Sequence, residues 1–328
     1  MKNKKILLVG GAGYIGNSVA KFFLQKNFQV ICFDSLVYSQ KQSIKALKKN
    51  KNYTFCYGDI RKTQDYIKII SEIDVIVILA GLVGDPITKK YKTLSKAINV
   101  DGIKRFVTKC KNYRNIERLI FISTCSNYGI GSNKILFDEK SKLKPLSIYA
   151  KQKVKLEKFI MSLKNTQYSP CILRFATAFG SSSRMRFDLT VNHFIKSLLE
   201  GKRLEIYDPL TWRPYCHVKD FARLIHKVTT CKKNKIAHQI FNAGNNNNNF
   251  TKLDIVKKIQ KFISTGSVIF KKNDVDKRNY RVDFSKIKKK LKFQTKFSLE
   301  YGIKEIISDI KKKKFLRKNI QLGNYSIK

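Results

Sequence analysis

The sequence predicts an α/β fold with a doubly wound parallel sheet and a smaller C-terminal substrate-binding region. Three observations carry this prediction: short apolar runs alternate with longer helical patterns, a glycine-rich turn follows the first run, and the alternation stops near Gly180. Alternating strands and helices are typical of βαβ units and a parallel sheet. Because the runs are apolar almost throughout, we expect helices on both faces of the sheet.

Six apolar runs are expected to form strands, at residues 6–9, 29–33, 53–57, 75–79, 119–122 and 171–173. Amphipathic stretches between them, such as 16–25 and 94–110, are expected to form helices. After Gly180 the pattern becomes irregular. We therefore assign residues 1–180 to a dinucleotide-binding domain, to which 217–245 returns, and assign 181–216 and 246–328 to the substrate-binding region.

The length, the N-terminal residues and the cysteines limit the class of protein. The chain has 328 residues, of which 43% are apolar, and no apolar run approaches the length of a membrane span. Residues 1–5 lead straight into a strand-like run, with no apolar leader. Seven scattered cysteines without a CxxC pair argue against disulfides and against a zinc site. We expect a cytoplasmic protein with no metal and no membrane partner.

The formal net charge of +45 would attract phosphates, nucleic acid or anionic membranes. The lysines are spread over nearly every segment, and the run at 311–314 resembles a solvated helix end. No nucleic-acid partner is therefore expected. A dinucleotide-binding fold that binds RNA, or one that acts as a redox-sensing scaffold, stays open as an alternative from another functional class.

The turn after the first strand places Gly10, Gly13 and Gly16 at GxxGxxG spacing, with Tyr14 and Ile15 between the last two. Glycine suits this turn because the backbone must bend tightly and approach a pyrophosphate. The following helix would point its N-terminal amides at that group. A strand before the turn and a helix after it predict a Rossmann-type dinucleotide site.

Asp34 ends the second predicted strand, roughly 20 residues beyond the glycine turn. A carboxylate at this position hydrogen-bonds the ribose hydroxyls of NAD and repels the 2′-phosphate of NADP. The sequence therefore favours NAD as cofactor. The alternative for Asp34 is a simple turn residue.

Tyr149 and Lys153 form a YxxxK pattern on a predicted helix that begins near Ser147. Residues four apart lie on one helical face. A nearby ammonium group lowers the pKa of a phenol, so that Tyr149 could exchange a proton near neutral pH. We predict that these two residues are catalytic.

A second YxxxK copy, Tyr215 and Lys219, follows Pro214. The proline makes a shared helical face less certain there, so we expect this copy to be structural.

Thr124 follows the predicted strand at 119–122, and strand ends of open α/β sheets face the ligand crevice. A hydroxyl there can hydrogen-bond a sugar oxygen and relay its proton to Tyr149. Thr124 is our candidate, with Ser123 and Ser126 as alternatives.

Taken together, these elements resemble the extended short-chain dehydrogenase/reductase family, in particular its NAD-dependent nucleotide-sugar epimerases and dehydratases, such as the UDP-glucose 4-epimerases. The resemblance runs over nearly the whole chain and includes the Trp212–Asp220 segment. It implies a catalytic triad of Thr124, Tyr149 and Lys153. It also implies NAD contacts at Gly10, Gly13, Tyr14, Ile15, Gly16, Asp34, Asp59, Ile60, Leu79, Ala80, Gly81, Asn99, Tyr149 and Lys153.

The resemblance further implies a nucleotide-diphosphate sugar as substrate. Arg213 and Arg278 resemble arginines that grip the diphosphate, for which guanidinium geometry is suited. The 183–192 stretch is similar to that of bacterial enzymes acting on surface-polysaccharide sugars such as GDP-linked heptoses. Arg186 and Asn192 in this stretch, with Thr124, complete the implied substrate contacts. Members of the family commonly form dimers, so a homodimer is expected.

Sugar 4,6-dehydratases of this family carry Thr-Asp-Glu at the strand end, but here Cys125 and Ser126 follow Thr124. Neither supplies the carboxylic acid needed to eliminate water. We therefore expect a nucleotide-sugar epimerase that acts through a 4-keto intermediate. A C4 dehydrogenase or reductase would use the same residues and remains the alternative.

Overall fold

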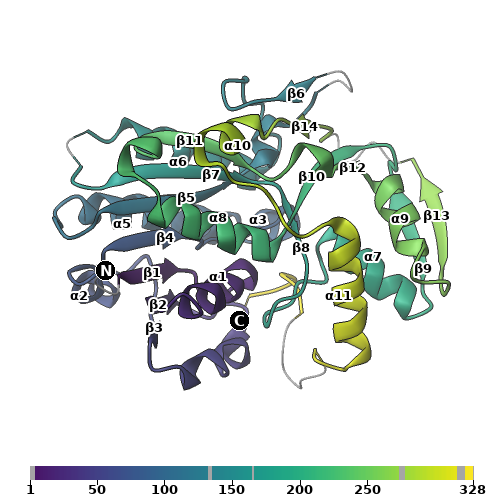
Figure 1. The fold of residues 1–328 in the computed structure, drawn as a ribbon, viewed down its shortest axis with the longest axis horizontal. Helices are drawn as coiled ribbons and strands as arrows, with labels where there is room; N and C mark the ends of the chain where they lie inside the picture. Colours follow the sequence, from purple (N-terminus) through teal and green to yellow (C-terminus); the bar gives the residue numbers. More distant parts are fainter. Residues whose placement is uncertain (1–3, 132–134, 165, 273–277, 316–321, 328) are drawn as a thin grey trace.

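The computed structural model describes residues 4–131, 135–164, 166–272, 278–315 and 322–327, and its largest element is a seven-stranded sheet (Figure 1). Its strands are β1 (Lys5–Val9), β2 (Gln29–Asp34), β3 (Tyr53–Tyr57), β4 (Val75–Ile78), β5 (Arg118–Thr124), β7 (Ser169–Phe175) and β11 (Gln239–Ala243). They lie in the order β11-β7-β5-β4-β1-β2-β3, and every pairing is parallel. The chain winds outward in both directions from β1, which confirms the predicted doubly wound α/β fold.

Both faces of this sheet are covered, because alternate residues of a strand point to opposite sides. Ile6 and Leu8 pack in a core with α1 and α8, which lie on the near side of the sheet in Figure 1. Leu7 and Val9 pack in a second core with α5 and α6. The helices of this part are α1 (Tyr14–Leu24), α2 (Ile67–Ile70), α3 (Asp85–Lys90), α4 (Lys92–Lys96), α5 (Ile103–Cys110), α6 (Ile148–Ser162) and α8 (Val218–Thr230).

Two elements differ from the sequence prediction. The helical stretch predicted over 94–110 is interrupted by a π-helix at Ala97–Gly102, between α4 and α5. Strand β11 is absent from the prediction, because the polar residues Gln239 and Asn242 break its apolar pattern. The Asn242 side chain is nevertheless buried, where its Oδ1 accepts a hydrogen bond from the Tyr128 hydroxyl at 2.7 Å.

The smaller region has its own core, in which Ile195, Ile255 and Ile303 are buried. It contains a three-stranded sheet in the order β12-β10-β8 and a parallel pair of β9 with β13. Its elements are β8 (Thr177–Phe179), α7 (Thr190–Leu199), β9 (Arg203–Tyr207), β10 (Trp212–His217), β12 (Asn249–Thr251), α9 (Lys252–Gln260), β13 (Ser267–Lys271) and α11 (Leu299–Lys311). In Figure 1 this region stands beside the carboxyl ends of the central strands.

The described residues from 246 onward are divided between the two parts of the molecule. Within the main core, Phe284 packs with Ile287 and Leu291 of α10 (Ser285–Leu291), beside β11. The short strands β6 (Leu136–Phe137) and β14 (Arg281–Val282) pair with each other next to them. In the described part of the chain, no helix combines the length and apolar character needed to cross a bilayer.

Candidate active site

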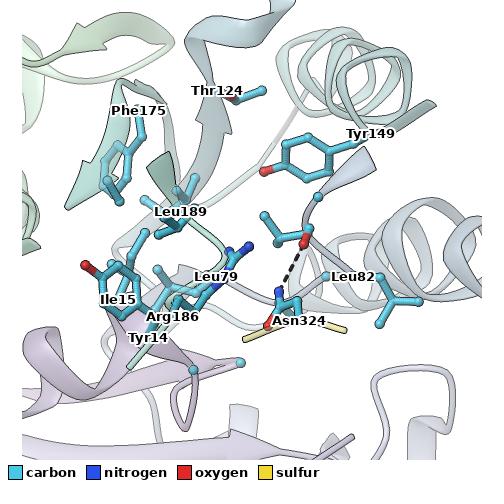
Figure 2. A pocket seen from close by; sticks show the side chains of 18 of the residues that line it. Tyr14, Ile15, Leu79, Leu82, Thr124, Tyr149, Phe175, Arg186, Leu189 and Asn324 are labelled. Carbon is cyan, nitrogen blue, oxygen red and sulfur yellow. Dashed lines mark hydrogen bonds between the residues drawn. The ribbon is translucent and has the colours of Figure 1, made fainter. Parts of the chain in front are cut away.

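A cavity of about 760 Å³ lies at the carboxyl ends of the central strands, where parallel α/β sheets bind their ligands. Residues from β1, β2, β5 and β7, together with the loop that follows β4, form one side of it. The opposite side comes from the smaller region, including Ala178, Leu189 and Tyr215. Figure 2 shows side chains from both parts converging on this space.

The glycine turn brings bare backbone to the cavity. Gly10 has a φ of +82°, and a Cβ added there would lie 2.6 Å from the Ala80 Cα. A Cβ on Gly16 would lie 2.5 Å from the Gly11 carbonyl oxygen, so neither position accepts a side chain. Gly13 is the N-cap of α1 and lines the cavity, with 3.4 Å from its added Cβ to the nearest other atom. An open helix N-terminus free of side chains fits the pyrophosphate of a dinucleotide.

Tyr14 and Ile15 of α1 also line the cavity. The Tyr14 hydroxyl donates a hydrogen bond to the Gly180 carbonyl at 2.6 Å and so joins the first helix to the smaller region.

Asp34, the last residue of β2, lines the cavity but is mostly buried. Its Oδ2 accepts a hydrogen bond from the Ala12 amide at 3.0 Å, and its Oδ1 accepts one from the Leu36 amide at 2.8 Å. Burial raises the pKa of Asp34, whereas these two amides act to lower it. The carboxylate thus braces the glycine turn at the place expected for a ribose.

The residues implied to contact the adenine and the rear of the cofactor take two kinds of position. Asp59, Ile60, Leu79, Ala80 and Gly81 line the cavity. Asn99 is buried behind the cavity wall.

The Asn99 side chain lies on the π-helix. Its Oδ1 accepts from the Leu82 amide at 2.7 Å, and its Nδ2 donates to the Gln152 side chain at 2.8 Å. Asn99 therefore supports the loop after β4 and the residue next to Lys153, rather than facing the cavity.

Tyr149 and Lys153 both lie on α6 and line the cavity, into which the Tyr149 ring projects (Figure 2). The Lys153 ammonium donates to the Ile122 carbonyl at 2.7 Å and lies 5.8 Å from the Tyr149 ring centre. Burial lowers the pKa of Lys153 to about 7, and the Glu157 carboxylate opposes that effect.

The expected lowering of the Tyr149 pKa is not seen in the protein alone. Burial raises the pKa of Tyr149, and Arg186 provides the largest opposing influence. A phenol removed from water ionises less readily. A lysine that is only partly protonated offsets this cost of ionisation less than a fully charged one would. Tyr149 in this state is a proton donor, and it becomes an acceptor only when positive charge increases near it.

Thr124 ends β5 at the cavity, and its Oγ1 accepts a hydrogen bond from the Ser126 amide at 3.1 Å. The Ser126 hydroxyl lies 3.1 Å from the Tyr280 hydroxyl and also lines the cavity. The Ser123 hydroxyl donates to Glu157, so it is committed to a structural bond. The Thr124 hydroxyl can therefore still donate a hydrogen bond to a ligand, whereas the Ser126 hydroxyl is paired with Tyr280 at the cavity wall.

The second Tyr-x-x-x-Lys copy has no shared helical face, since Tyr215 lies in β10 and Lys219 in α8. Lys219 forms an ion pair with Glu305.

Three of the four predicted substrate residues apart from Thr124 line the cavity: Arg186, Arg213 and Arg278. The Arg213 guanidinium stacks on the Tyr280 ring at 5.0 Å and donates to the Trp212 carbonyl at 2.7 Å. Arg278 pairs with Asp85 at 2.8 Å. Arg186, seen in the middle of Figure 2, donates to both carboxylate oxygens of Asp188, with 3.0 Å from Nε to Oδ1.

Asn192, the fourth, is completely buried and is absent from the described cavity wall. Its Oδ1 accepts from the Gly180 amide at 3.2 Å, while its Nδ2 donates to the Tyr14 hydroxyl at 3.1 Å and to the Arg186 carbonyl at 3.0 Å. With these bonds made, the side chain fastens the loop that carries Arg186, and a direct contact with the nucleotide is not supported.

Replacing Asn192 by Ala should destabilise the fold by about 3 kcal/mol, because several buried polar groups lose their partner. Thermal and urea unfolding measure this loss. The KM for the nucleotide sugar should change by less than about threefold in the folded fraction. An unchanged stability with a tenfold higher KM would instead make Asn192 a substrate ligand.

Sequence reasoning missed several residues of the cavity wall: Tyr38, Arg184, Lys252, Tyr280, Asn324 and Tyr325. Tyr280 lies two positions beyond Arg278, so the same motif could have indicated it.

Asn324 and Tyr325, near the end of the chain, line the cavity. The Asn324 amide donates to the Val83 carbonyl at 3.0 Å, which is the dashed line in Figure 2. The Arg184 guanidinium donates to the Gly323 carbonyl at 3.0 Å and lies 5.2 Å from the Tyr38 ring centre. Distant parts of the chain are thus joined over the dinucleotide side of the cavity, a contact that no local pattern indicates.

Comparison with known proteins agrees with this geometry. The profile of the NAD dependent epimerase/dehydratase family matches residues 6–244. The UDP-glucuronate 4-epimerase of Thermodesulfobacterium geofontis is 26% identical over 330 residues, which cover 96% of this chain and 99% of that protein.

Two solved structures are similar over almost their whole length. The UDP-glucuronic acid 4-epimerase of Bacillus cereus, in complex with UDP-glucuronic acid and NAD, is 28% identical with a TM-score of 0.85, covering 94% of this chain and 99% of that one. The dTDP-glucose 4,6-dehydratase of Bacillus anthracis, in complex with NAD, is 25% identical with a TM-score of 0.84, covering 97% and 100%. Epimerases and dehydratases thus share this architecture.

Proposed function

The chain belongs to the NAD dependent epimerase/dehydratase family, and from this premise we propose that it is a nucleotide-sugar 4-epimerase acting through a 4-keto intermediate. The protein is an enzyme that acts on nucleotide sugars and uses NAD as its cofactor. The observation that carries the finer proposal is the pairing of Thr124 and Tyr149 at one cavity, where no carboxylic acid follows Thr124.

The cofactor would be held by the glycine turn, by Asp34 and by Lys153. When bound, NAD accepts a hydride from the sugar and returns it. The chain itself supplies the open N-terminus of α1 for the pyrophosphate and a carboxylate for the ribose hydroxyls. Lys153 lies between the end of β5 and Tyr149, where its charge acts on the phenol.

Proton transfer belongs to Tyr149. Its phenolate takes the proton of the sugar C4 hydroxyl and the resulting phenol later returns it, while Thr124 hydrogen-bonds the same sugar oxygen. Burial raises the pKa of Tyr149, and Arg186 opposes that effect. The Lys153 ammonium, 5.8 Å from the Tyr149 ring centre, would add to the charge that favours the phenolate. The 4-keto sugar turns within the cavity, so that its opposite face is reduced.

The positions after Thr124 favour epimerisation over dehydration. Cys125 is buried, and its thiol donates to the Arg174 carbonyl. Among the described residues of the cavity wall, the carboxylates of Asp59, Asp85 and Asp188 pair with arginines, and that of Asp34 accepts hydrogen bonds from the Ala12 and Leu36 amides. Carboxylates engaged in this way do not take the place of the acid that follows the threonine in the dehydratases.

Incubation with UDP-, dTDP-, GDP- and CDP-sugars tests the proposal, with products followed by NMR and reduced nicotinamide by absorbance. A C4-epimeric product with no net reduced nicotinamide is expected. A keto product with stoichiometric reduced nicotinamide would establish the C4 dehydrogenase instead, and a 4-keto-6-deoxy product a dehydratase. Retention of RNA in a salt-sensitive manner, with no turnover of any sugar, would support the binding-protein alternative.

Replacing Arg213 by Met should raise the KM for the nucleotide sugar about 10- to 100-fold and lower kcat less, because a charge-assisted diphosphate contact is lost. Methionine keeps the packing against Tyr280. Steady-state kinetics measure the two constants separately. The exposed Arg203 on β9 provides the matched control, since Arg203→Met removes the same charge away from the cavity. Equal effects of both variants would contradict a direct contact.

We further propose a cytoplasmic homodimer that serves surface-polysaccharide synthesis, with α5 and α6 at the dimer contact. These helices carry exposed basic residues, including Arg105, Lys109, Lys151, Lys155 and Lys158. Since like charges would meet across such a contact, the dimer should strengthen as salt rises. Sedimentation at low and high salt measures this, and a monomer under both conditions would contradict the assembly.

A further inference from the structure

Behind the catalytic side chains lies a buried ion pair that the proposed mechanism does not use. Glu157 of α6 and Arg174 of β7 are each about 3% exposed, and Arg174 Nη2 lies 2.7 Å from Glu157 Oε2. The Arg174 Nε also donates to both carboxylate oxygens at 3.1 Å. A buried ion pair is weak support for stability, because desolvation offsets the attraction between the charges. Its position therefore calls for another explanation.

Glu157 joins the two elements that carry the active site. Tyr149, Lys153 and Glu157 are spaced four apart and share one face of α6. The Glu157 carboxylate also accepts hydrogen bonds from the Ser123 hydroxyl and from the Asn127 side chain, the latter at 2.8 Å. These two residues flank Thr124 at the end of β5. One carboxylate thus holds the strand end that presents Thr124 against the helix that presents Tyr149.

Besides its partner Arg174, Glu157 also acts through its charge on Lys153, one turn earlier on the same face of α6. Its ammonium is buried, donates to the Ile122 carbonyl and lies 4.6 Å from the Phe121 ring centre. Burial lowers its pKa to about 7, and Glu157 raises it. A small change in local charge therefore decides whether Lys153 is protonated at neutral pH.

Other titratable groups lie on the elements packed against α6. Arg174 on β7 is paired with the Glu157 carboxylate at 2.7 Å. Asp85 on α3 acts on Tyr149 and pairs with Arg278. Asp101 on the π-helix and Arg105 on α5 are exposed to solvent, which screens them. Within the described residues, Glu157 is the carboxylate that influences Lys153.

We propose that Glu157 is a positioning residue that keeps Lys153 protonated and fixes the spacing between Thr124 and Tyr149, while Arg174 holds its carboxylate in place. The inference rests on the proposed function only in treating Lys153 and Tyr149 as the proton-transfer machinery. The protonated lysine is the form that favours the Tyr149 phenolate. Glu157 offsets part of the lowering of the Lys153 pKa that burial causes, so the ammonium charge is present below that pKa and is lost as pH rises through it.

Three variants separate the charge of Glu157 from its structural bonds. Glu157→Gln leaves Arg174 buried without its partner, Arg174→Gln keeps the carboxylate, and the double variant replaces both charges by amides of similar size. If the single Glu157 variant fails to fold, the double variant still lacks the carboxylate and avoids an unpaired buried charge.

The direct measurement is the pH titration of the Lys153 ammonium by ¹⁵N NMR in the full chain, with and without added NAD, assigned with Lys153→Arg. The midpoint should fall by about one pH unit in both variants that lack Glu157, and should not fall in Arg174→Gln. The alkaline decline of kcat should move to lower pH by the same amount. An unchanged midpoint in the folded double variant would overturn the proposal.

The titration needs no turnover, so the two proposals fail separately. If the wild-type protein converts no nucleotide sugar, the proposed function fails while the Lys153 midpoint still tests the role of Glu157. If turnover is normal and the midpoint does not respond to the loss of Glu157, only the inference about Glu157 fails.

Discussion

Replacing Tyr149 by Phe should lower kcat about a thousandfold, because the variant loses the group that takes and returns the sugar proton. The ring that projects into the cavity remains, so binding of the nucleotide sugar should change little. The KM should stay within about threefold of the wild-type value. Steady-state kinetics with the substrate identified by NMR, together with equilibrium binding of NAD, measure both effects.

Tyr215→Phe is the matched control, since Tyr215 belongs to the second Tyr-x-x-x-Lys copy and also reaches the cavity wall. Tyr215 lies in a strand, β10, so it shares no helical face with a lysine as Tyr149 does. Its loss of kcat should be below about tenfold. A Tyr149 variant with full turnover, or equal losses in both variants, would remove Tyr149 from proton transfer.

Replacing Gly10 by Ala should destabilise the protein by about 3 kcal/mol or more and abolish detectable NAD binding. The new Cβ would lie 2.6 Å from backbone atoms of Ala80, and the φ of +82° is unfavourable for alanine. The glycine turn must therefore shift, together with the end of β4 behind it. Thermal unfolding and calorimetric titration with NAD measure the two losses.

Gly13→Ala separates folding from cofactor binding. An added Cβ there has its nearest other atom at 3.4 Å, so the chain should fold, with a loss of about 1 kcal/mol at the N-cap of α1. NAD affinity should nevertheless fall about tenfold or more, because the side chain occupies the approach to the helix amides. Equal NAD affinity of Gly13→Ala and wild type would show that the pyrophosphate is bound elsewhere.

The parts of the site that local sequence could predict are those set by local geometry. Each can be recognised from a few neighbouring residues: a glycine turn between strand and helix, a carboxylate at the end of the second strand, and a tyrosine four residues before a lysine. The doubly wound sheet was predictable for the same reason, since buried parallel strands require continuous apolar runs. Strand β11 escaped prediction because its polar side chains are satisfied only by tertiary contacts, as Asn242 is by Tyr128.

The residues that were misplaced or missed depend on long-range contacts. Asn192 was predicted to touch the nucleotide, but its side chain bonds to Tyr14, 178 positions away in the sequence. Asn324 reaches Val83 across 241 positions. The predicted direction of the Tyr149 pKa failed for a related reason. The spacing shows that an ammonium group is near Tyr149. Burial has the larger effect on the Tyr149 pKa, and burial is a property of the whole fold.

The cavity lies between the central sheet, which has a hydrophobic core on each face, and the smaller region, which has a core of its own. The cooperativity of unfolding should therefore depend on whether a ligand occupies the cavity. Without ligand, the third core can melt before the sheet, which gives two thermal transitions. A ligand that bridges the boundary binds only when both sides are folded, so saturation should merge the transitions into one. The same groove that positions the sugar would then make the two halves unfold as a single unit.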